Sequence, residues 1–367
     1  MKMPSITISF NEKAASAIKR GERGIIAMIL KDTVPKKNPI NITSVLDVPD
    51  ELSNENKEQI KLALMGYINP PKKVIAYVIG NEENPTESEE NPDGNKKDNY
   101  KEALTTFESI KFDYLVVPTV QTDGKTQDIV DYVKAQREAD KLIKAVLPVT
   151  KGDSEGIINF TTAELKENDK TYTTEQYCSR IAGIIAGTPL NMSCTYASMT
   201  ELTDCTRLAR AEEDKAVESG ELIAWFDGEK VKLGRGVNSL TTTTGDKGEQ
   251  FKKIKIVDAM DMISSDIKTT IQDNYIGKYA NTYDNKCLLI SAIGNYLDSL
   301  IKEEVLSQSS ISIDIEANRS FLKGKGIDTD SMSEYEIKTA NTGSGVFLMA
   351  KISIVDAIED IVLPIAI

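Results

Sequence analysis

The sequence predicts a multidomain fold of the α/β plus α+β class, with an α/β middle region, a helix-rich C-terminal domain carrying a small antiparallel sheet, and extended strand arms at both ends. Three observations predict it. Short apolar runs alternate with segments of helical period between residues 25 and 186. Two long helical patterns followed by alternating apolar residues lie after residue 246. Apolar strand patterns also stand at both termini.

The α/β region is predicted from apolar runs of strand length that are separated by helical patterns. The strand patterns cover residues 25–30, 40–48 (a weaker one), 73–80, 112–117, 142–147 and 157–160. The helical patterns cover residues 54–67, 100–110, 126–140, 174–186 and 205–218, with Thr173 or Thr174 as the cap of the fourth. This alternation favours a mostly parallel sheet. Asp227-Gly228-Glu229, between two strand patterns, predicts a hairpin.

The C-terminal part has a different pattern. Helical periodicity covers residues 257–275 and 285–307, and strand patterns follow. The first alternates Ile311, Ile313 and Ile315 with polar residues, and another begins at Tyr335 and Ile337. The third covers residues 345–355 and places apolar residues on one face: Val346, Leu348, Ile352 and Ile354. Two helices followed by such strands indicate an α+β domain.

Composition excludes several classes of function. The chain has 367 residues, a formal net charge of −13 and no histidine. The acidic balance argues against binding nucleic acid, which needs a cationic surface. Without histidine there is no Ser-His-Asp or Cys-His catalysis and no histidine-containing zinc site. We therefore expect a protein that is not an enzyme and that has no cofactor and no metal site.

Cysteines and hydropathy indicate the cellular compartment. None of the four cysteines lies in a Cys-x-x-Cys pair, so reduced and mostly buried thiols are expected. The N-terminus lacks the apolar core of a signal peptide, and the apolar run at residues 24–30 is too short to span a membrane. These features predict synthesis in a cytoplasm and no direct insertion into a membrane. Residues 81–99 are acidic and polar with two prolines, and they predict a surface loop.

One segment resembles a phosphate-binding loop. Gly124-Lys125-Thr126 follows a strand pattern and precedes a helical one. The motif also requires a glycine where this chain has Thr119, and without it the backbone cannot easily wrap around a phosphate. The alternative to a structural role is therefore a cytoplasmic α/β nucleotide-binding protein or enzyme that uses this loop. Asp328-x-Asp330 lacks the later ligands of a calcium loop.

The termini are the remaining candidates for function. Ile6, Ile8 and Phe10 alternate with hydroxyl residues, as in a strand with one apolar face. The C-terminal end is apolar too, through Ile361, Val362, Leu363 and Ile365. Unpaired strands are commonly hidden by adding them to another sheet. These ends pair either within their own subunit or with a neighbouring one.

The order of these features resembles the sheath proteins of contractile phage tails, and most closely the compact sheaths of prophage-derived phage-tail-like particles and R-type bacteriocins. The resemblance is most specific in MPSITISFNEKAASAIKRGERGIIAMILKDT, where a strand, a basic segment and a buried strand occur in the family's order. The α/β middle, the helices within residues 257–307 and the terminal GSGVFLMAKISIVDAIEDIVLPIAI support it. The likeness covers most of the chain.

The resemblance implies a structural subunit that polymerises as stacked hexameric rings around an inner tube. Such a sheath contracts from a metastable extended state and drives the tube through a cell envelope. It also implies terminal arms that add strands to neighbouring sheets, with Ile6, Ile8, Phe10 and Ile361–Ile365 as donors. The acceptor residues would be Ile311, Ile313, Ile315, Val346, Leu348, Ile352 and Ile354.

The implied partners are other copies of the chain, the inner tail tube protein, and baseplate and tail-terminator proteins at the two ends. The tube-facing surface would lie in the C-terminal domain, with Lys302, Glu303 and Glu304 as one candidate contact. The expected parts are an N-terminal arm (1–20), a small α/β or β-rich domain (21–98), an α/β domain (99–245), a tube-proximal α+β domain (246–357) and a C-terminal arm (358–367).

Overall fold

The computed structural model describes residues 17–80 and 99–366. Ile6, Ile8, Phe10 and almost all of the acidic segment 81–99 lie outside these residues. Backbone contacts divide the chain into two units. We call residues 22–262 with 356–366 the sheet unit, and residues 17–21 with 263–355 the ribbon unit. The finer five-part division stays a prediction.

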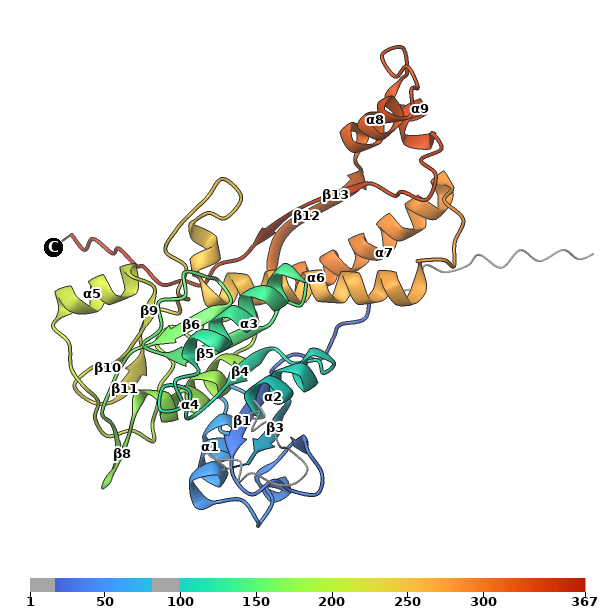
Figure 1. The fold of residues 1–367 in the computed structure, drawn as a ribbon. Helices are drawn as coiled ribbons and strands as arrows, with labels where there is room; N and C mark the ends of the chain where they lie inside the picture. Colours follow the sequence, from blue (N-terminus) through green and yellow to red (C-terminus); the bar gives the residue numbers. More distant parts are fainter. Residues whose placement is uncertain (1–16, 81–98, 367) are drawn as a thin grey trace, which may run out of the picture. The chain divides into compact units, whose positions relative to one another are not determined.

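The sheet unit is built on a seven-stranded sheet in the order β2-β3-β1-β4-β5-β6-β9 (Figure 1). Its strands are β1 (Ile25–Lys31), β2 (Ile40–Ile42), β3 (Lys73–Ile79), β4 (Tyr114–Val116), β5 (Lys144–Pro148), β6 (Ile157–Phe160) and β9 (Glu221–Leu222). All neighbours pair in parallel except β2, which is antiparallel to β3. The predicted parallel α/β sheet is therefore confirmed.

The central strands are apolar on both faces because helices cover both. On β1, Ile26, Met28 and Leu30 belong to a core shared with α1 (Asn54–Leu64) and α4 (Thr174–Ala186). The alternate residues, Ile25, Ala27 and Ile29, belong to a second core shared with α2 (Asn99–Glu108) and α3 (Thr126–Glu138). A strand buried on both faces reads as a continuous apolar run, which is why the sequence reveals it.

The start of helix α4 and its packing against α1 each depend on a particular residue type. Of the two predicted caps, Thr173 and Thr174, the structure has Thr173, which also forms a capping box with Gln176. Gly183 allows α4 to pack closely on α1, because a Cβ atom there would lie 2.3 Å from the carbonyl oxygen of Ala63. A larger residue at this position would push the two helices apart.

Smaller elements complete the sheet unit. They are η1 (Val45–Asp47), the hairpin of β7 (Leu165–Glu167) and β8 (Lys170–Tyr172), α5 (Arg210–Glu218), the hairpin of β10 (Ala224–Phe226) and β11 (Val231–Leu233), and η2 (Glu249–Lys252). The β10–β11 hairpin confirms the prediction from Asp227-Gly228, where Gly228 has a φ of 104°. Some predicted elements were too long. The strand predicted at 40–48 ends at Ile42 because a capping box at Ser44 starts η1, and the helix predicted at 205–218 begins only at Arg210.

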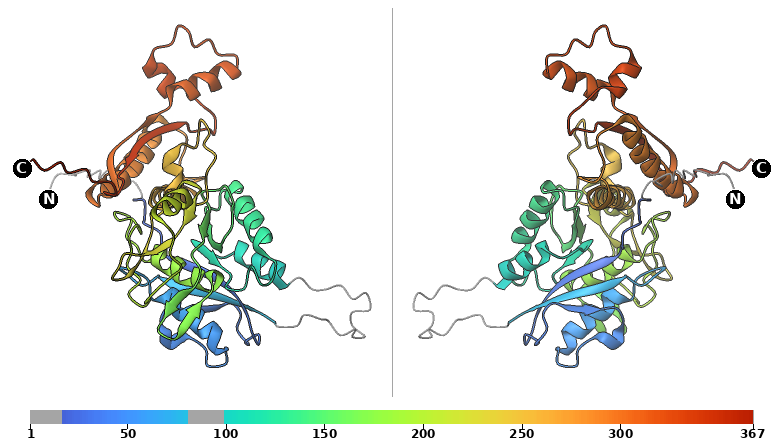
Figure 2. Two further views of the ribbon diagram at one scale, coloured as in Figure 1. Left: turned by 90° about the vertical axis from the view of Figure 1, so that its left-hand side faces the viewer. Right: turned by 90° about the vertical axis from the view of Figure 1, so that its right-hand side faces the viewer.

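The ribbon unit contains two long helices and a two-stranded antiparallel sheet. Its elements are α6 (Ile254–Asn274), α7 (Tyr283–Lys302), β12 (Leu306–Ile313), α8 (Ile315–Gly324), α9 (Glu334–Thr339) and β13 (Leu348–Ile354). The first part of α6, residues 254–262, belongs to the sheet unit. Helix α7 packs against β12. Helices α8 and α9 connect the two strands and lie at the end of the ribbon where Ile313 pairs with Leu348 (Figure 2).

The predicted strand at Tyr335 and Ile337 is wrong, since both residues lie in α9. Ser333 accepts a hydrogen bond from the Glu336 amide, and the Glu336 carboxylate accepts one from the Ser333 amide. This capping box satisfies the backbone groups at the start of a helix, so it overrides a two-residue apolar alternation. Ile337 is fully buried on one side of the short helix.

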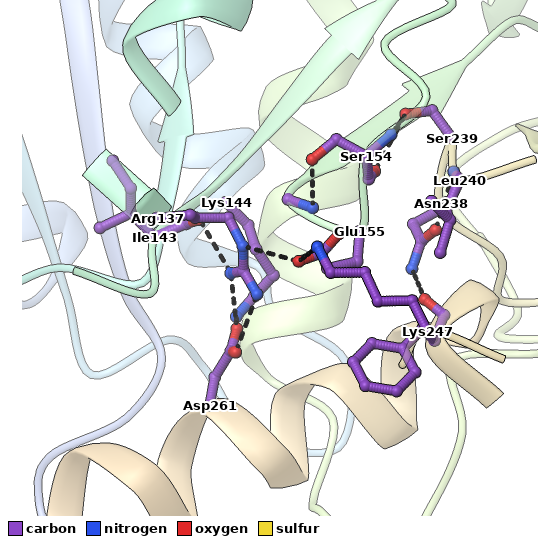
Figure 3. Close-up of polar contacts among 12 residues, drawn as sticks. Arg137, Ile143, Lys144, Ser154, Glu155, Asn238, Ser239, Leu240, Lys247 and Asp261 are labelled. Carbon is purple, nitrogen blue, oxygen red and sulfur yellow. Dashed lines mark hydrogen bonds and ion pairs between the residues drawn. The ribbon is translucent and has the colours of Figure 1, made fainter. Parts of the chain in front are cut away.

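A cluster of buried charges joins the start of α6 to the sheet (Figure 3). Lys144, whose side chain is 4% exposed, lies 2.7 Å from Asp261 and 3.2 Å from Asp258 on α6. Arg137 donates two hydrogen bonds to Asp261, at 2.9 and 3.0 Å. Arg23 donates one to Asp258 at 2.6 Å. Three cations therefore meet two carboxylates where solvent is excluded.

The cluster extends to the loop before α6. Glu155 lies 3.5 Å from Arg137 and accepts a hydrogen bond from Lys247 at 2.9 Å (Figure 3). Burial by itself raises the pKa of Asp258, but Lys144 and Arg23 outweigh it and hold that pKa below its usual value. Asp258 therefore stays charged in the fold, and its charge depends on its partners.

We predict that Lys144→Met destabilises the sheet unit by about 3 kcal/mol, since it leaves two buried carboxylates short of a cation. The measurement is urea unfolding followed by circular dichroism. Lys338→Met is the control, because it breaks only an exposed pair with Glu334 on α9 and should change stability by about 0.5 kcal/mol or less. Equal effects of the two substitutions would contradict the role given to the cluster.

The lowered pKa values also predict acid sensitivity. Asp258, Glu155 and Asp32 have pKa values below their ordinary values of 3.8, 4.5 and 3.8. Their stabilisation is present above the unfolded-state pKa and is lost as pH falls through the lower folded-state pKa. Urea midpoints should therefore be flat between pH 7 and 5 and fall below about pH 4. The urea midpoint of Asp258→Asn should fall less over the same pH range. A fall identical to that of the unmodified protein would contradict the role given to Asp258 in acid sensitivity.

Candidate assembly surfaces

The β12–β13 ribbon is the first candidate surface, because its outer edges are unpaired. Its strands pair from Leu306 opposite Ile354 to Ile313 opposite Leu348, with a register shift between Leu306 and Gln308. Within the described residues no third strand joins either of them. Such edges present a row of free backbone N–H and C=O groups, onto which another strand can be added.

The structure places five of the seven predicted acceptor residues in this ribbon: Ile311, Ile313, Leu348, Ile352 and Ile354. Ile315 and Val346 are not strand residues. The Asp314 side chain accepts a hydrogen bond from the Ala317 amide and so starts α8 at Ile315. Val346 lies in the irregular segment that precedes β13. Whether the five residues accept a donated strand stays a prediction.

The C-terminal segment, residues 356–366, is the second candidate surface. It forms no helix or strand, and its large apolar side chains are exposed. Among the predicted donors the exposed fraction ranges from 75% at Leu363 to 92% at Val362. Ile361 and Ile365 lie between these values. Exposed apolar residues in sequence are unusual on a monomer and indicate a surface that is covered in another state.

Polar contacts hold the beginning of this segment on the sheet unit. Lys253 pairs with Asp356, and Arg235 pairs with Asp360. Between them the Glu359 carboxylate accepts hydrogen bonds from Thr195 at 2.5 Å and from Ser193 at 3.2 Å. The segment is thus anchored up to Asp360 and apolar beyond it. This anchor was not predicted from the sequence, although three acidic residues shortly before an apolar tail were a visible signal.

The first described residues are anchored in the ribbon unit. Arg20 pairs with Glu303, and the Gly21 amide donates a hydrogen bond of 2.8 Å to Asp266. The Tyr296 hydroxyl donates a second hydrogen bond to Asp266, at 2.8 Å. These contacts fix the point from which an N-terminal arm would start.

The candidate tube contact lies at the end of α7. Lys302 is the last helical residue, Glu303 follows as its cap, and Glu304 has a φ of 60°. All three are exposed. Glu303 already pairs with Arg20, which gives it a role within the subunit. Contact of these residues with a tube stays a prediction.

The Gly124-Lys125-Thr126 loop does not have the geometry of a phosphate site. The backbone amides of Gln121 and Thr122 already donate hydrogen bonds to the Glu175 carboxylate, at 2.9 and 3.2 Å. Lys125 pairs with Asp128 at 2.8 Å. A carboxylate thus occupies the amides that would hold a phosphate, and its charge would repel one. The loop serves as the entry to α3.

In residues 17–80 and 99–366 no three Cys, Asp or Glu side chains converge as metal ligands would. Over those residues, no helix has the length and apolarity to cross a bilayer.

Comparison with known proteins agrees with these features. Residues 93–239 match the family model for the phage tail sheath protein central domain, and residues 246–367 match that for the phage tail sheath C-terminal domain. The tail sheath protein of Clostridium phage phiCD119 is 41% identical over 364 residues, which cover 97% of each chain.

Solved structures share the fold. The sheath tail protein of Desulfitobacterium hafniense has a TM-score of 0.68 at 19% identity, with 85% of this chain and 94% of that one covered. The contracted helical sheath of the anti-feeding prophage has a TM-score of 0.69 at 13% identity, with 100% and 99% covered. On the two domain matches and the full-length relative, the chain belongs to the phage tail sheath family.

Proposed function

We propose that copies of this chain stack as hexameric rings around an inner tube and are linked by strands exchanged between subunits. Membership of the family makes the chain a structural subunit of a contractile tail sheath. The observation that carries the finer proposal is the β12–β13 ribbon, whose two outer edges pair with no other strand within residues 17–80 and 99–366, in a chain whose C-terminal segment is apolar and exposed. Free edges and unpaired apolar segments complement each other when several copies meet.

Magnitudes support a link that is reversible alone and persistent in a polymer. An added strand of six residues forms about four hydrogen bonds, each contributing about 1 kcal/mol net. Burying each apolar side chain contributes about 1.5–3 kcal/mol, whereas ordering the segment costs about 1–2 kcal/mol per residue. A single link is therefore marginal. Linked subunits meet their partners at high effective concentration, so a broken link re-forms quickly.

Pro364 restricts how the C-terminal segment can pair. Proline has no backbone N–H, so the strand edge that carries residue 364 cannot form a full ladder. Backbone groups of alternate residues point to opposite edges of a strand. The amides of Ile361, Leu363 and Ile365 would therefore face the acceptor strand, and the segment would pair along this edge only.

Contraction is proposed to move subunits as nearly rigid bodies from a metastable extended state. The two cores of the sheet unit and its buried charge cluster support rigidity, since close-packed interiors transmit force with little deformation. Strand links would persist while the other contacts between subunits are rebuilt. The stored packing energy drives the tube through the target envelope without nucleotide hydrolysis.

The remaining partners follow from the same proposal. The inner tube protein would contact the ribbon unit, with Lys302, Glu303 and Glu304 as candidate residues, and baseplate and terminator proteins would bind the two ends of the polymer. Synthesis in the bacterial cytoplasm precedes assembly into a tail or a released particle.

We predict that replacing Ile361, Leu363 and Ile365 by Asp abolishes tubular assembly and leaves a folded monomer, because a donated strand would then bury three charges. Negative-stain electron microscopy of concentrated protein measures assembly, and circular dichroism measures folding. The control replaces Leu46 by Asp, which adds a charge at an exposed apolar residue of η1. Striated tubes formed by the triple variant would contradict strand donation by this segment.

Deletion of residues 1–16 tests the other arm. This deletion keeps Arg20 and Gly21, whose contacts with Glu303 and Asp266 fix the start of the described chain. We expect folded subunits that form no tubes, since each subunit loses one of its two links. The same microscopy distinguishes the outcomes, and normal tubes from this deletion would rule out an N-terminal link.

A further inference from the structure

A pocket of about 380 Å³ lies on the sheet unit, between α5 and the beginning of the C-terminal segment. Tyr196 and Trp225 line it, and their ring centroids are 5.5 Å apart. Tyr196 is 51% exposed, so the pocket opens to the surface. Glu359 and Asp360 contribute to the lining from the C-terminal segment itself. The pocket therefore depends on this segment being in place.

Two buried polar atoms at the pocket lack hydrogen bonds within the described residues. They are the indole nitrogen of Trp225 and Oε2 of Glu359. The Glu359 side chain is 8% exposed, and the nearest cations to Oε2, Arg235 and Lys253, lie 3.6 and 3.9 Å away. A buried carboxylate oxygen without a donor is costly, so Oε2 of Glu359 favours a group that donates a hydrogen bond, whereas the indole N–H of Trp225 needs an acceptor.

The lining is also strongly acidic. Two cations, Arg210 and Arg235, face five carboxylates, which belong to Glu213, Asp214, Glu218, Glu359 and Asp360. Arg210 lies 3.4 Å from both Glu213 and Asp214, and Arg235 pairs with Asp360. Excess negative charge in the lining attracts a cation.

The chain itself limits which cation can enter. All eight of its arginines lie within 4.0 Å of a carboxylate of their own subunit, at Arg20, Arg23, Arg137, Arg180, Arg207, Arg210, Arg235 and Arg319. The 36 lysines include exposed ones such as Lys36 and Lys37. In the proposed assembly each subunit lies against other copies of itself, so a lysine of a second copy is the most available cation.

We propose that this pocket receives a lysine side chain from a second copy of the chain. The inference rests on the proposed assembly and adds a contact that strand exchange does not require. The ammonium group would donate to Oε2 of Glu359. It is not needed by the Trp225 ring, because Lys232 of the same subunit already lies 5.8 Å from the centroid of that ring. Because Glu359 belongs to the C-terminal segment, filling the pocket holds the beginning of that segment in place. Contact with one neighbour would thereby orient the strand offered to another.

Trp225 provides a direct measurement, because it is the only tryptophan of the chain. Acrylamide quenching of its fluorescence is compared in free subunits and in assembled tubes. We expect quenching to fall at least threefold on assembly. If Trp225 is quenched as strongly in tubes as in the free subunit, the proposal that the pocket is filled on assembly would be wrong, and the proposed function would be unaffected. Failure of the chain to form tubes would overturn both.

Cross-linking identifies the occupant. Subunits with and without ¹⁵N are mixed, assembled and treated with a carbodiimide, which joins a carboxylate directly to a lysine amine. Glu213, Asp214 or Glu218 should link to a lysine of the other isotopic type. Glu218→Gln should remove its own link, whereas Glu51→Gln, at an exposed site outside the pocket, should not change the pattern. Tubes without such links, or links to lysines of another protein only, would overturn the proposal.

Discussion

The fold of the sheet unit depends on two buried carboxylates at the start of α6. Asp258 and Asp261 are surrounded by Lys144, Arg137 and Arg23, which come from three separate parts of the chain. No member of this cluster can be removed without leaving a charge in a medium that solvates it poorly. The cluster therefore fixes the first turns of α6 to the sheet, and the chain enters the ribbon unit through this helix.

A contractile sheath needs a rigid subunit and contacts that survive large movements. The sheet unit supplies the first through two apolar cores, one on each face of its sheet. The β12–β13 ribbon and the C-terminal segment offer the second, because free strand edges can bind a strand in any arrangement that keeps the ends within reach. The contacts of Glu359 and Asp360 hold the C-terminal segment on the rigid sheet unit up to residue 360. The apolar residues beyond Asp360 are left to bind a neighbouring subunit.

Short sequence patterns correctly predicted those helices, strands and turns whose structure is determined by residues close together in the chain. Continuous apolar runs identified β1 and β3, the Thr173-Thr174 pair identified the start of α4, and Asp227-Gly228 identified a hairpin. The strand predicted at Tyr335 failed because two apolar residues suit either a strand or a helix. The capping box at Ser333 and Glu336 was the stronger signal. Likewise Asp314 marked the start of α8, although Ile315 continued an apparent strand pattern.

The candidate surfaces were only partly predictable. The apolar C-terminal end was visible in the sequence, because exposed apolar runs are unusual. The charge cluster was not visible, since Lys144 and Asp261 are 117 positions apart and no local pattern says which charges meet. The pocket at Trp225 depends on residues from three regions of the chain for the same reason.

Amide hydrogen exchange, measured by mass spectrometry on free subunits and on assembled sheath, tests the account most directly. We predict that amide exchange slows on assembly in β12, β13 and residues 361–366, because the backbone groups of these residues gain hydrogen-bond partners in the assembled sheath. We also predict that amide exchange is unchanged in β1, β4, β5 and residues 254–262, because the buried charge cluster holds these residues in place in the free subunit and in the assembled sheath. Unchanged exchange at the ribbon, or a large change within the central sheet, would contradict a rigid subunit linked through exchanged strands.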